Sequence, residues 1–211
     1  MELLAKQITQ AKDMFLKNEK YLLFILIIVF YFFAFKAYSA SEDKADALNY
    51  LSSLSDFSAS FLQSDGENLS EGKIYVGKNR VRAEYFEPNK ILIILDEEKA
   101  MYYNYELEED EFFNPKDTNA WFFYDIFRNP LFFVDGKIKE KNNELLLEKK
   151  GIDNEEKNFV IKVIFEKQPL VLRAIEVVIN DDILKLSIYN HSYNEVFDKN
   201  FFKLINPNFL N

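Results

Sequence analysis

The chain has 211 residues, a formal net charge of −9, no cysteine and one histidine. This composition excludes disulfides, thiolate metal sites, cysteine nucleophiles and any metal site built from several histidines of one chain. The acidic balance also argues against a nucleic-acid partner, because such a surface repels phosphates. With 22 Phe and 12 Tyr but only 5 Gly and 5 Pro, the composition is that of a globular protein.

The first segment of the chain has the pattern of an export signal. Residues 21–35 form an unbroken apolar run, lysines precede it, and Ala37-Tyr38-Ser39 supplies the small residues of a cleavage site. We therefore predict that residues 1–39 are a signal peptide, cut before Ala40. As a helix the run covers ~22 Å, short of the ~30 Å hydrocarbon core, which favours cleavage over an uncleaved membrane anchor, the alternative. Export without cysteine points to a bacterial envelope.

Residues 40–211 are predicted to form a single domain. Apolar residues at helical spacing predict a helix over 44–54, and alternation predicts a strand over 56–63. Further strands are predicted over 73–76, 79–86, 91–95, 100–105, 106–113, 143–149, 159–166, 171–180 and 183–189, and a second helix over 119–128. Short turns join successive strands without βαβ alternation, which predicts a curved antiparallel sheet, a sandwich or a barrel with two or three helices.

The strand over 79–86 has the clearest alternation in the chain. Val81, Ala83 and Tyr85 are expected on the concave face. Arg80, Arg82 and Glu84 are expected on the convex face, in solvent.

The excess of aromatic residues has two interpretations. Large aromatic side chains can simply fill a core. Alternatively, a strongly curved sheet has a concave face too broad for two short helices to fill, which leaves an apolar cavity for an apolar ligand.

Several motifs occur in an order that resembles a known family. They are Leu51-x-x-Leu54-x-x-Phe57-x-Ala59-x-Phe61-x-Gln63, the Gly72–Val76 stretch, the Arg80–Pro88 stretch that runs ungapped to Asn104, and the closing segments around 172–180, 186–189 and 201–207. This pattern resembles the periplasmic outer-membrane lipoprotein carriers (LolA-like). The family's Arg-Pro dipeptide falls at about Gly77-Lys78 here, so an arginine that matters for cargo handling in the family has no clear counterpart.

The resemblance implies a fold, a function and partners. The fold would be mainly β with a few helices: a strongly curved, incompletely closed antiparallel β-barrel covered by α-helices. The protein would be a periplasmic, monomeric carrier that binds the acyl chains of lipoproteins. It would receive them from an ATP-driven lipoprotein-releasing exporter of the inner membrane and deliver them to an outer-membrane acceptor or to the outer membrane itself.

The residues expected to contact the cargo are apolar or aromatic. We place Met101 and Tyr103 in the concave wall beside Ile93 and Leu95. The full expected set is Val81, Tyr85, Ile93, Leu95, Met101, Tyr103, Trp121, Phe122 and Phe127.

Other functions fit the sequence less well. The acidic cluster at 106–111 and the Asp181-Asp182 pair could be catalytic or cation-binding, but they are typical of solvated turns, and no phosphate-binding loop, G-x-S-x-G or HExxH motif occurs. His191, in a polar turn, is expected at the surface. We therefore predict neither an enzyme nor a cofactor. A membrane-tethered lipid- or lipoprotein-binding module of the same fold, and a carrier for another apolar ligand such as a glycolipid, remain alternatives.

Overall fold

The structure is a computed structural model that describes residues 42–129, 131–153, 156–180 and 182–209. The predicted signal peptide or anchor, residues 1–39, lies outside the described residues. The elements described below belong to one compact unit, Asp43–Asn211.

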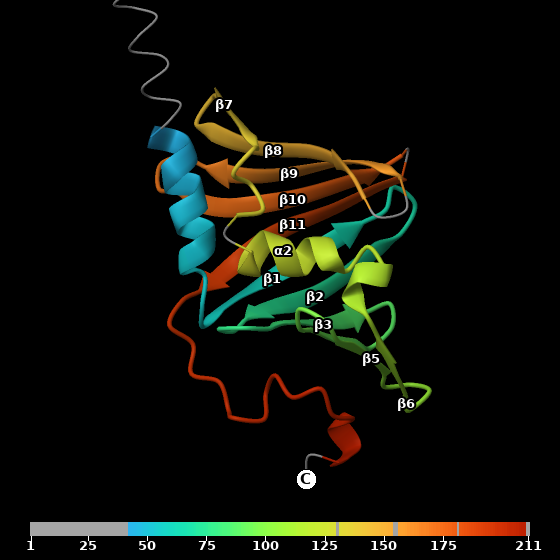
Figure 1. Ribbon diagram of the computed structural model, residues 1–211. Coiled ribbons are helices and arrows are strands. Elements are labelled where there is room, and N and C mark those ends of the chain that lie inside the picture. Colours follow the sequence, from blue (N-terminus) through green and yellow to red (C-terminus); the bar gives the residue numbers. More distant parts are fainter. Residues whose placement is uncertain (1–41, 130, 154–155, 181, 210–211) are drawn as a thin grey trace, which may run out of the picture. The chain divides into compact units, whose positions relative to one another are not determined.

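One antiparallel sheet of 11 strands dominates this unit, with the strand order β6-β5-β4-β3-β2-β1-β11-β10-β9-β8-β7 (Figure 1). The strands are β1 Phe57–Ser64, β2 Leu69–Val76, β3 Val81–Glu87, β4 Ile91–Leu95, β5 Ala100–Asn104, β6 Glu109–Phe113, β7 Lys137–Lys141, β8 Glu144–Ile152, β9 Asn158–Glu166, β10 Val171–Ile179 and β11 Asp182–Ser192. β6 and β7 are the two edges, so the sheet curves without closing. The predicted fold class, a mainly β, incompletely closed antiparallel sheet with helices, is confirmed.

The strand that the sequence analysis missed is β7, Lys137–Lys141. It alternates lysine with other residues, and all but Ile138 are exposed. Charged edge strands of this kind resist pairing with other chains, and their polarity removes the apolar alternation that marks a strand in sequence.

A helix over residues 42–53 packs on the sheet, as the spacing of its apolar residues requires. Ala47, Leu51 and Leu54, spaced four and three apart, are buried. The chain leaves this helix through Asp56, whose φ of 56° lies in the left-handed region that aspartate tolerates. Within the described residues, no helix is long and apolar enough to cross a membrane.

The second helix, α2 (Trp121–Arg128), lies across the concave face of the sheet (Figure 1). Phe122, Ile126 and Phe127 are buried, as the near-helical aromatic spacing predicts. They pack in one apolar cluster with the inward-facing residues of the strands, such as Phe57 and Phe165. The main core therefore lies between the sheet and the two helices.

A second, smaller cluster lies on the other face of β4 and β5. It consists of Leu92, Ile94, Met101 and Tyr103, against which Leu204 packs. Leu204 belongs to the C-terminal segment, residues 193–209, which follows β11 and ends in a short 3-10 helix, Pro207–Phe209. The C-terminal segment therefore covers part of the convex face of the sheet.

The covering corrects one expectation about β3. Val81, Ala83 and Tyr85 do face the main core, as predicted. Arg82 lies on the convex face, but that face is not open to solvent there, because the C-terminal segment lies over it. The Arg82 side chain is only 12% exposed, and its Nη1 donates to the carbonyl oxygen of Phe201 at 2.5 Å.

Candidate functional site

An apolar cavity of about 210 Å³ lies between the concave face of the sheet and the start of α2. Its lining contains no charged side chain. The lining residues are Phe61, Gln63, Ile74, Val81, Ala83, Tyr85, Ile93, Leu95, Asn119, Ala120, Phe123, Leu184 and Leu186.

Strand geometry explains how distant segments supply this lining. Alternate residues of a strand share a face, and paired residues of neighbouring strands stand side by side. Val81 pairs with Leu95, and Ala83 pairs with both Ile74 and Ile93. The wall is therefore continuous across β2, β3 and β4, while Ala120 and Phe123 of the α2 segment form the roof.

Gln63 and Tyr85 form a polar pair within the mostly apolar lining, and Asn119 is the third polar residue there. Tyr85 Oη donates a hydrogen bond to Gln63 Oε1 at 2.8 Å. Burial raises the pKa of Tyr85 to about 12, so the hydroxyl keeps its proton at physiological pH.

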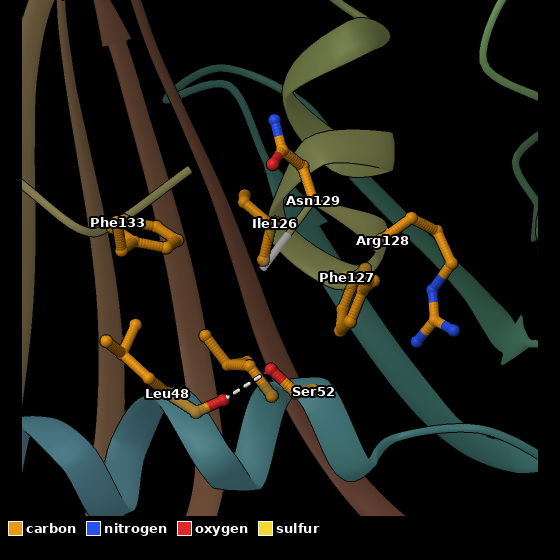
Figure 2. A pocket seen from close by; sticks show the side chains of 8 residues that line it. Leu48, Ser52, Ile126, Phe127, Arg128, Asn129 and Phe133 are labelled. Atoms are coloured by element: carbon orange, nitrogen blue, oxygen red, sulfur yellow. Dashed lines mark hydrogen bonds between the residues drawn. The ribbon is translucent and has the colours of Figure 1, made fainter. Parts of the chain in front are cut away.

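A separate groove lies between the helix over 42–53 and the end of α2 (Figure 2). It has a volume of about 200 Å³. Figure 2 shows that Leu48 and Ser52 come from the first helix, and that Ile126 and Phe127 of α2 point toward it.

Arg128 holds the end of α2 in place. Its guanidinium donates to the carbonyl oxygens of Leu54, at the end of the first helix, and of Lys78, in the turn between β2 and β3, the latter at 3.1 Å. Burial lowers the pKa of Arg128, and no described hydrogen-bond partner reaches its buried Nε. The contacts join α2 to both the first helix and the sheet.

Four of the nine expected cargo residues line the apolar cavity: Val81, Tyr85, Ile93 and Leu95. The three expected from α2 lie elsewhere. Phe122 is fully buried in the core, Phe127 lines the groove instead, and Trp121 packs edge-on against Phe159 with ring centroids 5.8 Å apart.

The expected position of Met101 and Tyr103 beside Ile93 and Leu95 is wrong. Met101 pairs with Ile94, and Tyr103 pairs with Leu92. Both are therefore on the convex face, in the small cluster under the C-terminal segment, where Met101 is 0% and Tyr103 1% exposed. The residue of β5 that stands beside Ile93 is Tyr102.

The sequence analysis missed the lining from β1, β2 and β11. Phe61 and Gln63 share the predicted alternation of β1, and Leu184 with Leu186 shows the same spacing in β11. Alternation could have assigned each pair to one face. It could not show that β11 pairs with β1, because these strands lie at opposite ends of the domain sequence.

Among the described residues, no group of three or more metal-ligating side chains occurs. His191 lies near the end of β11 and not in the expected polar turn. It is partly buried, its Nε2 donates to the carbonyl oxygen of Leu172 at 2.6 Å, and burial lowers its pKa.

One solved structure shares the fold at low sequence identity, and two others are similar over parts of their length. An uncharacterized conserved protein from Thermus thermophilus is 11% identical, with a TM-score of 0.51 over 78% of this chain and 93% of that one. MucB in complex with MucA(peri) gives 8% identity and a TM-score of 0.42 over 78% of this chain. A Pseudomonas aeruginosa MucA/MucB complex gives 8% and 0.43 over 75%. This chain spans 59% and 60% of those two matched chains.

The sequence comparison is more specific. No curated protein matches the chain in sequence. The family profile described as outer membrane lipoprotein carrier protein LolA matches residues 52–205, which include all eleven strands and α2. The chain therefore belongs to the LolA family of outer membrane lipoprotein carrier proteins.

Proposed function

We propose that this protein carries the acyl chains of lipoproteins through the periplasm, from the inner to the outer membrane. The observation that carries the proposal is the uncharged cavity under α2, in a member of a lipoprotein-carrier family. Each exposed methylene of an acyl chain costs ~0.8 kcal/mol in water, so a lipid-modified protein needs a cover in order to cross an aqueous space.

The lining suits a carrier, which has to release its cargo. An uncharged wall of aliphatic and aromatic side chains holds hydrocarbon through burial and dispersion, without a network of ionic contacts. Such binding is strong enough to shield a chain and leaves few directional bonds to break when the cargo is delivered.

The cavity has to enlarge before it can hold cargo. Its volume of about 210 Å³ lies below the range of ~300–1,000 Å³ that is usual for small-molecule sites. The helix α2 is the part that has to move, because the residues at its start roof the cavity, while Arg128 ties its other end to the carbonyl oxygens of Leu54 and Lys78. We propose that acyl chains enter when α2 moves away from the sheet and from the first helix, which enlarges the cavity.

Transfer of a lipoprotein tests the function. Inner-membrane vesicles that contain a lipoprotein, its ATP-driven exporter and ATP are incubated with the full chain, and the lipoprotein in the supernatant is measured after sedimentation. We expect release that depends on both ATP and this protein. Equal release with an unrelated acidic protein would contradict the proposal. Native mass spectrometry of the protein isolated from cells should show bound lipid or lipoprotein.

A membrane-tethered version of the same module is the second candidate, because an apolar run such as residues 21–35 anchors a chain when it is not removed. If that run is retained, the protein would receive or hand over acylated cargo at one membrane instead of shuttling. The N-terminal residue of the protein isolated from cells distinguishes the two. A start near Ala40 supports the shuttle, and a start at Met1 supports the tethered module.

A further inference from the structure

Gln63 and Tyr85 are unusual residues for a cavity that only has to hold hydrocarbon. Leucine and phenylalanine would fill the same space with no amide or hydroxyl to remove from water. Binding sites for small molecules commonly combine an apolar wall with a few placed polar groups that orient the ligand. The pair therefore points to a polar atom in the cargo.

The backbone is arranged so that this pair can form across an intervening strand. Gln63 belongs to β1 and Tyr85 to β3, and β2 runs between them. The β2 residue paired with Tyr85 is Gly72, where a Cβ would lie 2.5 Å from Cζ of Phe61. Without a side chain there, the rings of Phe61 and Tyr85 meet edge-on at 5.0 Å, and the Tyr85 hydroxyl reaches Gln63.

The hydrogen bond between the pair uses only one side of the Gln63 amide. Tyr85 Oη donates to Oε1, which orients the amide and leaves the two N–H donors of Nε2. No described group accepts a hydrogen bond from Nε2. The Gln63 side chain lines the cavity and is only partly buried, so these donors are accessible to a ligand.

We propose that Gln63, positioned by Tyr85, binds the carbonyl oxygen of an ester- or amide-linked acyl chain whose hydrocarbon lies in the apolar cavity. The inference rests on the proposed function and names the part of the cargo that the cavity recognises. The carbonyl oxygen of the cargo accepts a hydrogen bond from Nε2 of Gln63, and the methylenes that follow it contact side chains such as Val81 and Ile93. Esters and amides join acyl chains to lipid headgroups and to lipoproteins, whereas a bare alkane has no such acceptor.

Two brominated probes of equal chain length test this, a fatty-acid methyl ester and the corresponding alkane. Native mass spectrometry measures the binding of both probes. The full chain contains one tryptophan, Trp121, which follows Ala120 of the cavity lining, so bromine quenching of its fluorescence is a second measurement. We expect the wild type to bind the ester about threefold to tenfold more tightly than the alkane, as one hydrogen bond allows.

The variant Gln63→Met keeps the length of the side chain and removes the donor. Its ester affinity should fall to that of the alkane, while its alkane affinity stays the same or rises. Tyr85→Phe removes only the hydroxyl that orients Gln63, so it should reduce the preference without abolishing it. Leu62→Gln is the matched control, since it adds an amide to the neighbouring, outward-facing position of β1 and should leave both affinities unchanged.

The outcomes separate this inference from the proposed function. If Gln63→Met keeps the wild-type preference for the ester, Gln63 is not the anchor. If Gln63→Met does not fold, Gln63→Glu replaces it, because an ionised carboxylate has no donor and should also lose the preference. If the wild type binds neither probe by either measurement, the carrier function itself is wrong. If the preference for the ester is lost as expected, the affinities for a triacylated lipopeptide and for a phospholipid with the same acyl chains are compared. Tighter binding of one of them identifies lipoprotein or membrane lipid as the source of the carbonyl.

Discussion

The guanidinium carbon of Arg82 lies 4.2 Å from the centroid of the Phe201 ring, which fixes the C-terminal segment to the convex face of the sheet. Tyr75 of β2 contacts the same Phe201 ring edge-on, with centroids 4.9 Å apart. Arg82 also forms an ion pair with Glu84. A segment with little secondary structure is thus held by a mostly buried cation, a pair of aromatic rings and a hydrogen bond from the Arg82 side chain to a backbone carbonyl.

Arg82→Met should loosen this segment. The change removes the cation–π contact and the hydrogen bond to the Phe201 carbonyl, and we expect the free energy of unfolding to fall by about 1–3 kcal/mol. Chemical denaturation measures that change, and limited proteolysis should show faster cleavage within residues 193–209. Arg173→Met is the control, because Arg173 forms only an exposed ion pair with Glu166. Equal effects of the two changes would contradict the assigned role of Arg82.

Arg128→Met should free the end of α2. The variant loses the hydrogen bonds to the carbonyl oxygens of Leu54 and Lys78, and we expect a destabilisation of about 1–3 kcal/mol. Amide hydrogen exchange should become faster in α2, and an apolar fluorescent dye should bind more rapidly. Lys116→Met, a change of an exposed cation nearby, is the control. Unchanged exchange in α2 would show that Arg128 does not restrain this helix.

The stability of the protein should decrease as the pH falls below about 6.5, because of His191. Burial and nearby Arg173 lower its folded-state pKa below the unfolded value, although the hydrogen bond to Leu172 opposes this. The unfolded chain therefore binds a proton more readily than the folded one. This stabilisation is fully present above pH 6.5 and is lost as the pH falls toward the folded pKa.

Thermal unfolding between pH 7.5 and pH 5 measures this effect. Because the chain has one histidine, His191→Gln should remove most of the change over this interval. The carboxylates whose pKa values are lowered, such as Asp135 and Glu195, change the stability of the fold at more acidic pH. A variant with the same pH dependence as the wild type would show that another group is responsible.

The sequence predicts the elements better than it predicts their faces. Wherever one face is buried and the other carries charge, as in β3, alternation assigns the faces correctly. In β4 and β5 both faces carry apolar side chains, because the main core covers one and the C-terminal segment covers the other. Because neither face of β4 or β5 is polar, the alternation of residues in the sequence could not show on which face Met101 lies.

Long-range pairing limits the prediction of the site itself. The polar partners Gln63 and Tyr85 are separated by a strand that has to carry glycine at the point of contact. Each residue is visible in the sequence, and the family resemblance includes both. The hydrogen bond between the two side chains depends on the register of β1, β2 and β3 and on glycine at position 72. The local periodicity of the sequence encodes neither.

Matched aspartate substitutions in β4 and β5 test the assignment of the two faces. Met101 is fully buried in the convex cluster, so Met101→Asp should destabilise the fold by several kcal/mol, whether or not the cavity binds cargo. Ile93 lines the cavity and is only partly buried, so water can reach a carboxylate there. Ile93→Asp should therefore lower the melting temperature less and reduce acyl-chain binding more.

The two substitutions are compared by thermal unfolding and by binding of a fatty-acid methyl ester, each relative to the wild type. The assignment requires Met101→Asp to have the larger effect on thermal unfolding and Ile93→Asp to have the larger effect on ligand binding, because Met101 supports the fold and Ile93 contacts the ligand. Ile93→Asn serves as an additional control, since it adds polarity without charge and should weaken binding to an intermediate extent. If Met101→Asp folds normally and loses only binding, Met101 faces the cavity and the pairing of β4 with β5 has to be shifted by one residue.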